Sequence, residues 1–361
     1  MAESTPARFS DTLLDHLRTV GDPLADAALS ELGAATVRPP PGADLVTAVC
    51  RHAEASPGAC RELIDQAYAV PSWVSFPRML AGYRVGFSYP VAGGMALLCG
   101  SLAESYASAL GAKVLIRTGN LERSTRIRIY ETADFLHTLA SSNGPRPGSA
   151  AHRVLLNLRL LHARIRKLTA QRSDWELRWG QPVNQEDYGS TLLVFSLVYA
   201  RSLQRLGVRL SLEELDSLHH GWRYAGYVMG VDSRLLTESR AEEQLLYTAI
   251  TRRHHHPDND SRVLLAALFS AMAWQPPFFV PTAALHAICR QLLGEELADA
   301  LAVPRDPLWQ AAPAAMRALG RVQHALCSVV PGALWLAQQV GTKIVENTLT
   351  YGLSPSRVAR R

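Results

Sequence analysis

The sequence predicts an all-α protein in which many helices surround one large hydrophobic core. The 361 residues are 48% hydrophobic but only 7% aromatic, and abundant alanine and leucine favour helix over sheet. Apolar residues recur at helical spacing through most of the chain. Candidate strands are confined to two short segments, 113–116 and 278–280. A chain of this length can bury a sizeable core.

The helices are expected in the following order. Residues 1–40 predict a helix and the start of a proline-rich linker, "TVRPPPGAD". Ser211 and Glu214 have the spacing of a capping box that opens a later helix. We therefore expect an N-terminal helix and linker over 1–40, followed by a single all-α domain over 41–361. Its other helices are expected at about 43–69, 94–111, 122–141, 150–170, 189–206, 259–273, 281–302, 309–329 and 333–348.

Composition and charge exclude several classes of protein. The net charge of +5 is small and the arginines are scattered, so a nucleic-acid partner is not expected. The apolar stretch 87–103 contains Pro90 and ends at Glu104, which predicts a buried core helix and no transmembrane segment. No signal peptide is evident, and five cysteines without a CxxC pair predict free thiols. A cytoplasmic protein is expected.

One histidine lies on the apolar face of the predicted helix 150–170. In "NLRLLHARIRK", residues 157–167, His162 falls within an apolar arc, and Arg159 and Arg166 border it. A buried imidazole needs a hydrogen-bond partner or a metal, and buried guanidiniums need anions. A haem satisfies all three, through its iron and its propionates. The alternative is a core histidine bonded to a carbonyl, with both arginines on surface carboxylates. The arc consists of Val154, Leu155, Leu158, Leu161, Ile165 and Leu168.

A second helix carries polar residues within an apolar face. In "RIRIYETADFLHTL", residues 126–139, Arg128 and Thr132 share a face with Phe135 and Leu139. These two residues are candidates for a site. The alternative is a threonine bonded to its own turn and an arginine whose stem covers apolar surface.

Other motifs of catalytic sites are absent from the sequence. Three consecutive histidines, residues 254–256, cannot easily converge on one metal ion, so no metal site is predicted there. The chain contains no GxSxG, no HExxH and no glycine-rich phosphate loop after a strand. A nucleotide-binding Rossmann domain is therefore not expected.

Taken together, the motifs resemble those of the latex-clearing-protein and MpaB-like oxygenase family. The resemblance covers roughly residues 65–330, and the order of the motifs is more specific than any one of them. It implies a globin-related all-α core that holds a b-type haem and activates dioxygen. Members cleave isoprenoid double bonds or act on a prenyl chain of a small natural product. The motifs include "LIRTGNL", "RIYETADFL", "RLLHARIR", "QPVNQEDYGSTLLVFS" and "LGVRLSLEELDSLHHGWRYAGYVMGV".

The resemblance also implies roles for individual residues. His162 matches the axial haem ligand, and Arg159 and Arg166 match the arginines that flank it. Arg128 and Thr132 match the arginine and threonine near the haem. Glu131, a further candidate catalytic residue, stands where latex-clearing proteins can carry a lysine, so a lysine-capped resting state is not expected.

The sequence thus predicts a haem b-dependent oxygenase with His162 as its iron ligand. Its partners would be dioxygen, or a peroxide, and a small apolar molecule, as in natural-product metabolism. The alternative is an all-α protein that binds haem or an apolar ligand without turnover. The sequence leaves the oligomeric state open.

Overall fold

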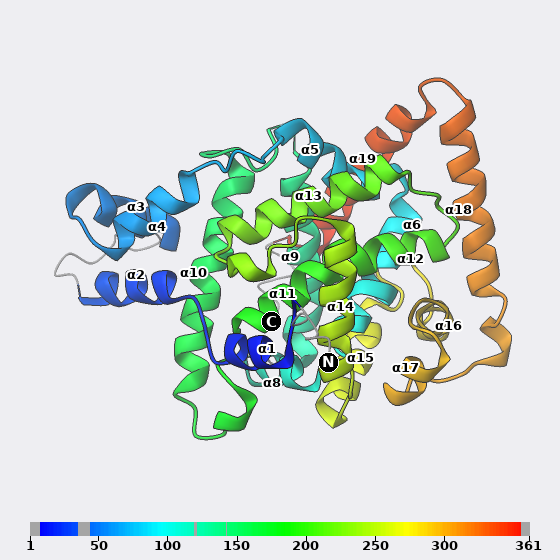
Figure 1. Ribbon diagram of the computed structural model, residues 1–361. Coiled ribbons are helices and arrows are strands. Elements are labelled where there is room, and N and C mark those ends of the chain that lie inside the picture. Colours follow the sequence, from blue (N-terminus) through cyan, green and yellow to red (C-terminus); the bar gives the residue numbers. More distant parts are fainter. Residues whose placement is uncertain (1–7, 35–43, 119–120, 142, 355–361) are drawn as a thin grey trace, which may run out of the picture. The chain divides into compact units, whose positions relative to one another are not determined.

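The structure is a computed structural model that describes residues 8–34, 44–118, 121–141 and 143–354 (Figure 1). Within these ranges the chain forms helices joined by turns and contains no strand, only an isolated bridge between Ser108 and His255. The all-α prediction is confirmed. The two candidate strands are wrong: residues 113–116 lie in helix α8 (Ala109–Thr118) and 278–280 are irregular.

The chain divides into two compact units, each made of three separate segments. Unit 1 comprises Met1–Phe76, Pro145–Leu192 and Arg223–Arg253, and unit 2 comprises Pro77–Gly144, Leu193–Trp222 and His254–Arg361. The division was not predicted from the sequence, for which a single domain over 41–361 was expected. The expected boundary at residue 40 lies outside the described residues and stays a prediction.

Unit 1 is built around the long helix α10 (Ala150–Ala170), which has the predicted bounds. The side chain of Ser149 caps its first turn by accepting a hydrogen bond from the His152 amide. Helices α2 (Pro23–Ala34), α3 (Leu45–Ala55) and α4 (Ala59–Tyr68) pack together, with α2 and α3 against α10 (Figure 1). One helix was expected over 43–69. It breaks before α4, where Gly58 has a φ of +149° that other residues rarely adopt. The other helices of the unit are α1 (Asp11–Arg18), η3 (Leu177–Trp179), α11 (Gln185–Leu193), η5 (Ser233–Leu235) and α14 (Arg240–His254).

Unit 2 is organised around helices α9 (Leu121–Leu139), α15 (Asn259–Met272) and α19 (Ala333–Gly352), with α9 packed against the other two. Helix α13 (Leu212–Val228) begins in this unit, and the predicted capping box is confirmed by reciprocal hydrogen bonds between Ser211 and Glu214. The remaining helices are α5 (Phe76–Arg84), η1 (Val85–Ser88), α6 (Pro90–Met95), η2 (Ala96–Leu102), α7 (Ala103–Ser105), η4 (Val194–Val198), α12 (Tyr199–Arg205), α16 (Thr282–Leu293), α17 (Glu295–Ala300), η6 (Pro307–Trp309) and α18 (Ala312–Val329).

None of the described helices is by itself long and apolar enough to cross a bilayer. Phe76–Ser88 and Pro90–Ser105 pass a test of length and composition only as a pair, and the pair is bent by 96°.

Helix α19 approaches η1 so closely that only glycine fits at the contact. A Cβ atom on Gly341 would overlap the carbonyl oxygen of Phe87, a backbone atom that cannot turn away. Gly341→Ala should therefore lower the free energy of unfolding by about 1–3 kcal/mol, as overpacking does. Denaturant titration followed by circular dichroism measures this.

The matched control is Gly33→Ala in α2, where a Cβ meets no atom within 4 Å. This change should leave the free energy of unfolding unchanged or raise it by up to about 1 kcal/mol, because alanine is the better helix former. Equal effects of the two substitutions would contradict the tight contact.

Candidate functional site

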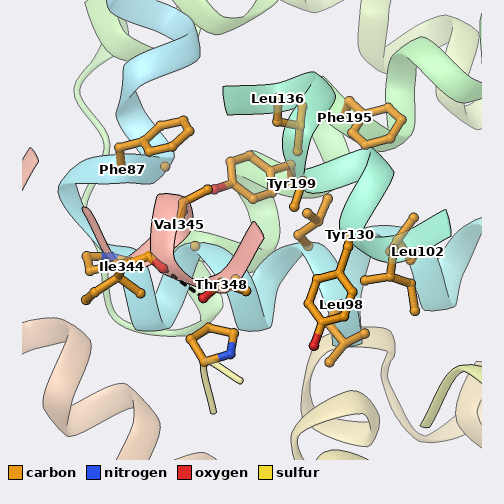
Figure 2. A pocket seen from close by; sticks show the side chains of 18 of the residues that line it. Phe87, Leu98, Leu102, Tyr130, Leu136, Phe195, Tyr199, Ile344, Val345 and Thr348 are labelled. Atoms are coloured by element: carbon orange, nitrogen blue, oxygen red, sulfur yellow. Dashed lines mark hydrogen bonds between the residues drawn. The ribbon is translucent and has the colours of Figure 1, made fainter. Parts of the chain in front are cut away.

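Unit 2 contains an apolar cavity of about 150 Å³ (Figure 2). An apolar cavity of this size holds a group as large as benzene. No histidine, cysteine, carboxylate, lysine or arginine lines it among the described residues, so it fits an apolar group better than a metal ion. The lining side chains labelled in Figure 2 are those of Phe87, Leu98, Leu102, Tyr130, Leu136, Phe195, Tyr199, Ile344, Val345 and Thr348.

Two π-helical segments shape this cavity. Leu97, Leu98 and Leu102 come from η2, and Phe195 comes from η4. The two segments also contact each other. A π-helix contains an extra residue per turn, which redirects side chains and often marks a functional site. Here the two irregular segments supply four of the residues that line the cavity.

Glycines make room for the aromatic rings of the cavity. A Cβ atom on Gly93 would lie 3.0 Å from the Tyr199 hydroxyl oxygen, and one on Gly86 would overlap it. A Cβ on Gly94 would overlap the Phe278 ring. The polar end of Tyr199 can reach its position because Gly86 and Gly93 lack side chains.

Tyr199 provides an uncommitted hydrogen-bonding group in the cavity. The hydroxyl of Tyr83 donates to the Gly221 carbonyl, that of Tyr130 to Pro276 at 3.4 Å, and that of Thr348 to Ile344 at 2.7 Å. The Tyr199 hydroxyl has no hydrogen bond to any described residue. Burial raises the pKa of this phenol, so it is neutral and can donate a proton in a hydrogen bond. This residue was not predicted from the sequence.

His162 lies on α10 in unit 1, where it is partly buried. Its Nδ1 atom is buried without a hydrogen bond, and its ring lies 5.4 Å from that of Tyr188, whose hydroxyl is also buried and unbonded. Burial lowers the pKa of His162 to about 4, and the charge of Arg166 acts in the same direction. The imidazole is therefore neutral at pH 7, and one ring nitrogen keeps a free lone pair.

The two arginines that flank His162 are paired with aspartates of the same unit. Arg159 donates to both carboxylate oxygens of Asp22, at 2.6 and 3.1 Å, and both side chains are only 2–3% exposed. Arg166 binds the Asp26 carboxylate at 2.9–3.1 Å and donates to the Val183 carbonyl at 2.6 Å. The guanidiniums thus already have anionic partners, as the alternative interpretation required. However, Asp22 is buried and does not lie on the surface.

The apolar arc predicted for α10 is wrong in part. Leu161 and Leu168 are 38% and 57% exposed, whereas Leu156, Leu160 and Ala163 are buried in the cluster with α2, α3 and α4. The buried face is rotated because the two arginines are themselves buried.

The second group of predicted residues lies on α9 in unit 2. Thr132 donates its hydroxyl hydrogen to the Arg128 carbonyl at 2.7 Å, as the alternative interpretation expected. Glu131 is exposed. Arg128 is partly buried, and none of the described carboxylates pairs with it. Its neighbours Ile129 and Ala133 line the cavity, but Arg128 and Thr132 do not.

The structure thus places the predicted residues in two groups. Unit 1 holds His162 with Arg159 and Arg166, and unit 2 holds Arg128, Glu131 and Thr132. A separate set of metal-ligand side chains, Glu31, His52 and Cys60, lies in unit 1 with ligand atoms within 4.8 Å of one another. Protein contacts occupy this set: His52 Nε2 is 2.8 Å from Glu31, and the Cys60 thiol donates to the Ala28 carbonyl at 3.4 Å.

Comparison with known proteins decides the family. The model of the "ER-bound oxygenase mpaB/B'/Rubber oxygenase, catalytic domain" family matches residues 88–325, about two thirds of the chain. The chain belongs to the mpaB/rubber oxygenase family. The resemblance expected from the sequence is therefore confirmed, and the protein is an oxygenase.

A solved structure supports the fold of this mpaB/rubber oxygenase member. The structure of latex clearing protein LCP in the closed state is similar to it with a TM-score of 0.66. The match covers 91% of both chains at 20% sequence identity. No curated protein sequence gives a significant match.

Proposed function

We propose that this oxygenase depends on haem b, that His162 is the axial ligand of its iron, and that its substrate is a small apolar molecule. The unbonded imidazole of His162 carries this proposal. Buried histidines normally find a hydrogen-bond partner, and one that lacks it is available to a metal. His162 matches the family's ligand position and is neutral at pH 7, which is the state that binds iron.

The residues around His162 fit such a ligand. Its orphaned Nδ1 atom and the Tyr188 hydroxyl are buried polar atoms without a hydrogen-bond partner among the described residues. A haem bound there would supply the activation of dioxygen. The chain's contribution is an imidazole held in place and kept unprotonated.

We assign Arg159 and Arg166 a positioning role. Each fixes α10 to an aspartate on or beside α2, three residues before and four after His162. The charge of Arg166 also disfavours protonation of the imidazole, because it lowers the pKa of His162. Arg128, Thr132 and Glu131 stay proposed as residues near the haem because of their match to the family.

The cavity of unit 2 is proposed to receive an apolar part of the substrate. Its volume suits one benzene-sized group, such as a ring or a branched segment of a chain. The hydroxyl of Tyr199 would donate a hydrogen bond to an oxygen atom of that substrate.

Tyr199→Phe tests this assignment. For a substrate with an oxygen atom near its apolar group, the variant should bind about 5–15-fold more weakly, since one neutral hydrogen bond contributes about 1–1.5 kcal/mol. A hydrocarbon analogue without oxygen should bind the two proteins equally. Titration calorimetry measures both constants, and equal losses for the two ligands would exclude the role of the hydroxyl.

Oxygen uptake tests the proposed activity. The haem-supplied protein, with a reductant and an isoprenoid substrate, should consume dioxygen and place label from ¹⁸O₂ in the product. Retention of haem without any oxygen uptake, over a series of apolar substrates, would instead favour a carrier that binds haem or an apolar ligand without turnover.

A further inference from the structure

We propose that helices α18 and α19 dock on the surface of an anionic lipid bilayer. These helices are consecutive in the chain and pack against each other, with Pro331 and Gly332 in the turn between them (Figure 1). The docking surface consists of large apolar side chains that are 40–78% exposed: Leu319, Val322, Leu326, Val329, Val330, Leu334, Trp335, Leu336 and Val340.

The apolar stripe of α18 faces solvent. Leu319, Val322, Leu326 and Val329 follow one another at intervals of three and four residues, so they form a single continuous face. The opposite face holds the helix to unit 2: Gly320 is buried, and a Cβ on it would overlap the Leu206 carbonyl oxygen. A continuous apolar stripe on the solvent-exposed side of a packed helix indicates a surface that binds a hydrophobic partner or a membrane.

The charge of this region selects an anionic bilayer. Residues 307–345 contain no aspartate or glutamate, although the chain has 32 of them. The same stretch carries Arg317, Arg321 and Lys343; Arg321 and Lys343 are exposed, and Lys343 pairs with Glu346 at 2.9 Å, just beyond the stretch. Cationic side chains beside an apolar face are typical of helices that lie in the lipid headgroup region. The exposed Trp335 near the turn suits this region as well.

Helix α19 connects this surface with the cavity. Val340 is exposed on the docking surface, and Ile344, one turn later on the same side of the helix, lines the cavity together with Val345 and Thr348 (Figure 2). A substrate dissolved in the bilayer could therefore pass along α19 into the cavity. This delivery role rests on the proposed function, whereas docking itself does not.

Vesicle sedimentation of the full chain tests docking. The protein should sediment with phosphatidylcholine vesicles that contain phosphatidylserine, and about tenfold less with phosphatidylcholine alone or at high salt. Val329→Glu should reduce binding to the anionic vesicles by about tenfold or more, because a carboxylate would enter the headgroup region. Trp335→Ser, which leaves the charge unchanged, should reduce it severalfold.

Leu177→Glu is the matched control, because Leu177 is 93% exposed but lies in unit 1, and its binding should equal that of the wild type. Circular dichroism confirms that each variant is folded.

Absence of vesicle binding by the wild-type protein would overturn the proposal. A wild-type dimer that Val329→Glu converts to a monomer, without vesicle binding, would show that a second copy covers this surface. Haem content and turnover of a detergent-dissolved substrate should be the same in Val329→Glu as in the wild type, which separates this test from that of the proposed function.

Discussion

His162→Ala is expected to give a folded helical protein that no longer retains haem. The iron would lose its protein ligand, and no neighbour on the same side of α10 can replace it. Leu158 and Ile165 are apolar, and the guanidiniums of Arg159 and Arg166 have no lone pair to donate. Stability should change little, because none of the described residues makes a hydrogen bond to the buried Nδ1 atom of His162.

The matched control lies on the same helix. His152 is buried and its Nε2 atom is 2.8 Å from the Ala67 carbonyl oxygen, so it already has a partner in the protein. His152→Ala should lower the free energy of unfolding by about 1–3 kcal/mol and leave haem content unchanged. Haem content by the pyridine haemochrome method, measured for both variants, separates the two roles. Equal haem contents would contradict the assignment of His162.

Asp22→Ala should have the largest effect on stability. Arg159 and Asp22 form a two-bond ion pair in which both side chains are almost fully buried. Removing the carboxylate leaves an uncompensated buried charge, which costs about 3–5 kcal/mol. The substitution also removes the hydrogen bond from the Ala25 amide to Asp22 at the start of α2. Urea unfolding measures the loss.

Asp174→Ala is the control for this experiment. Asp174 forms an ion pair with Arg172, but both side chains are nearly half exposed, and exposed pairs contribute little. Its unfolding curve should overlap that of the wild type. If Asp22→Ala also unfolds like the wild type, this result would contradict the claim that Arg159 is buried and needs the Asp22 carboxylate as its partner.

The sequence predicted the course of the helices well where periodicity and capping agree. The apolar repeat predicted both ends of α10, whose start Ser149 caps in the structure, and Ser211 with Glu214 predicted the start of α13. The break before α4 was missed because it depends on the backbone conformation of Gly58. The relation to globins was not tested and stays a prediction.

The candidate site was predicted only in part, for a physical reason. Periodicity identified His162 and its two arginines, but it could not reveal that Asp22 and Asp26, more than 130 positions away, are their partners. The predicted apolar arc also put Arg159 and Arg166 at the edge of the core, whereas both are buried, so the buried face of α10 was placed incorrectly. An arginine normally marks the solvent-exposed face of a helix, but one that forms a buried ion pair lies on the buried face.

The cavity was not predicted because residues from separate segments form it. The sequence signals are the glycines at 86, 93 and 94 and the aromatic residues at 195 and 199. They do not indicate a cavity in the sequence, because the two groups come together only in the folded chain. The two π-helical segments add residues out of register with a regular helix. A calculation of helical periodicity therefore misassigns their faces.

The absorption spectrum of the wild-type protein, purified after growth with added haem precursor, tests the central claim most directly. We predict one haem b per chain, with a Soret band and the bands of iron bound to an imidazole. A protein that shows no Soret band, even after incubation with haemin, would contradict both the haem cofactor and the role of His162.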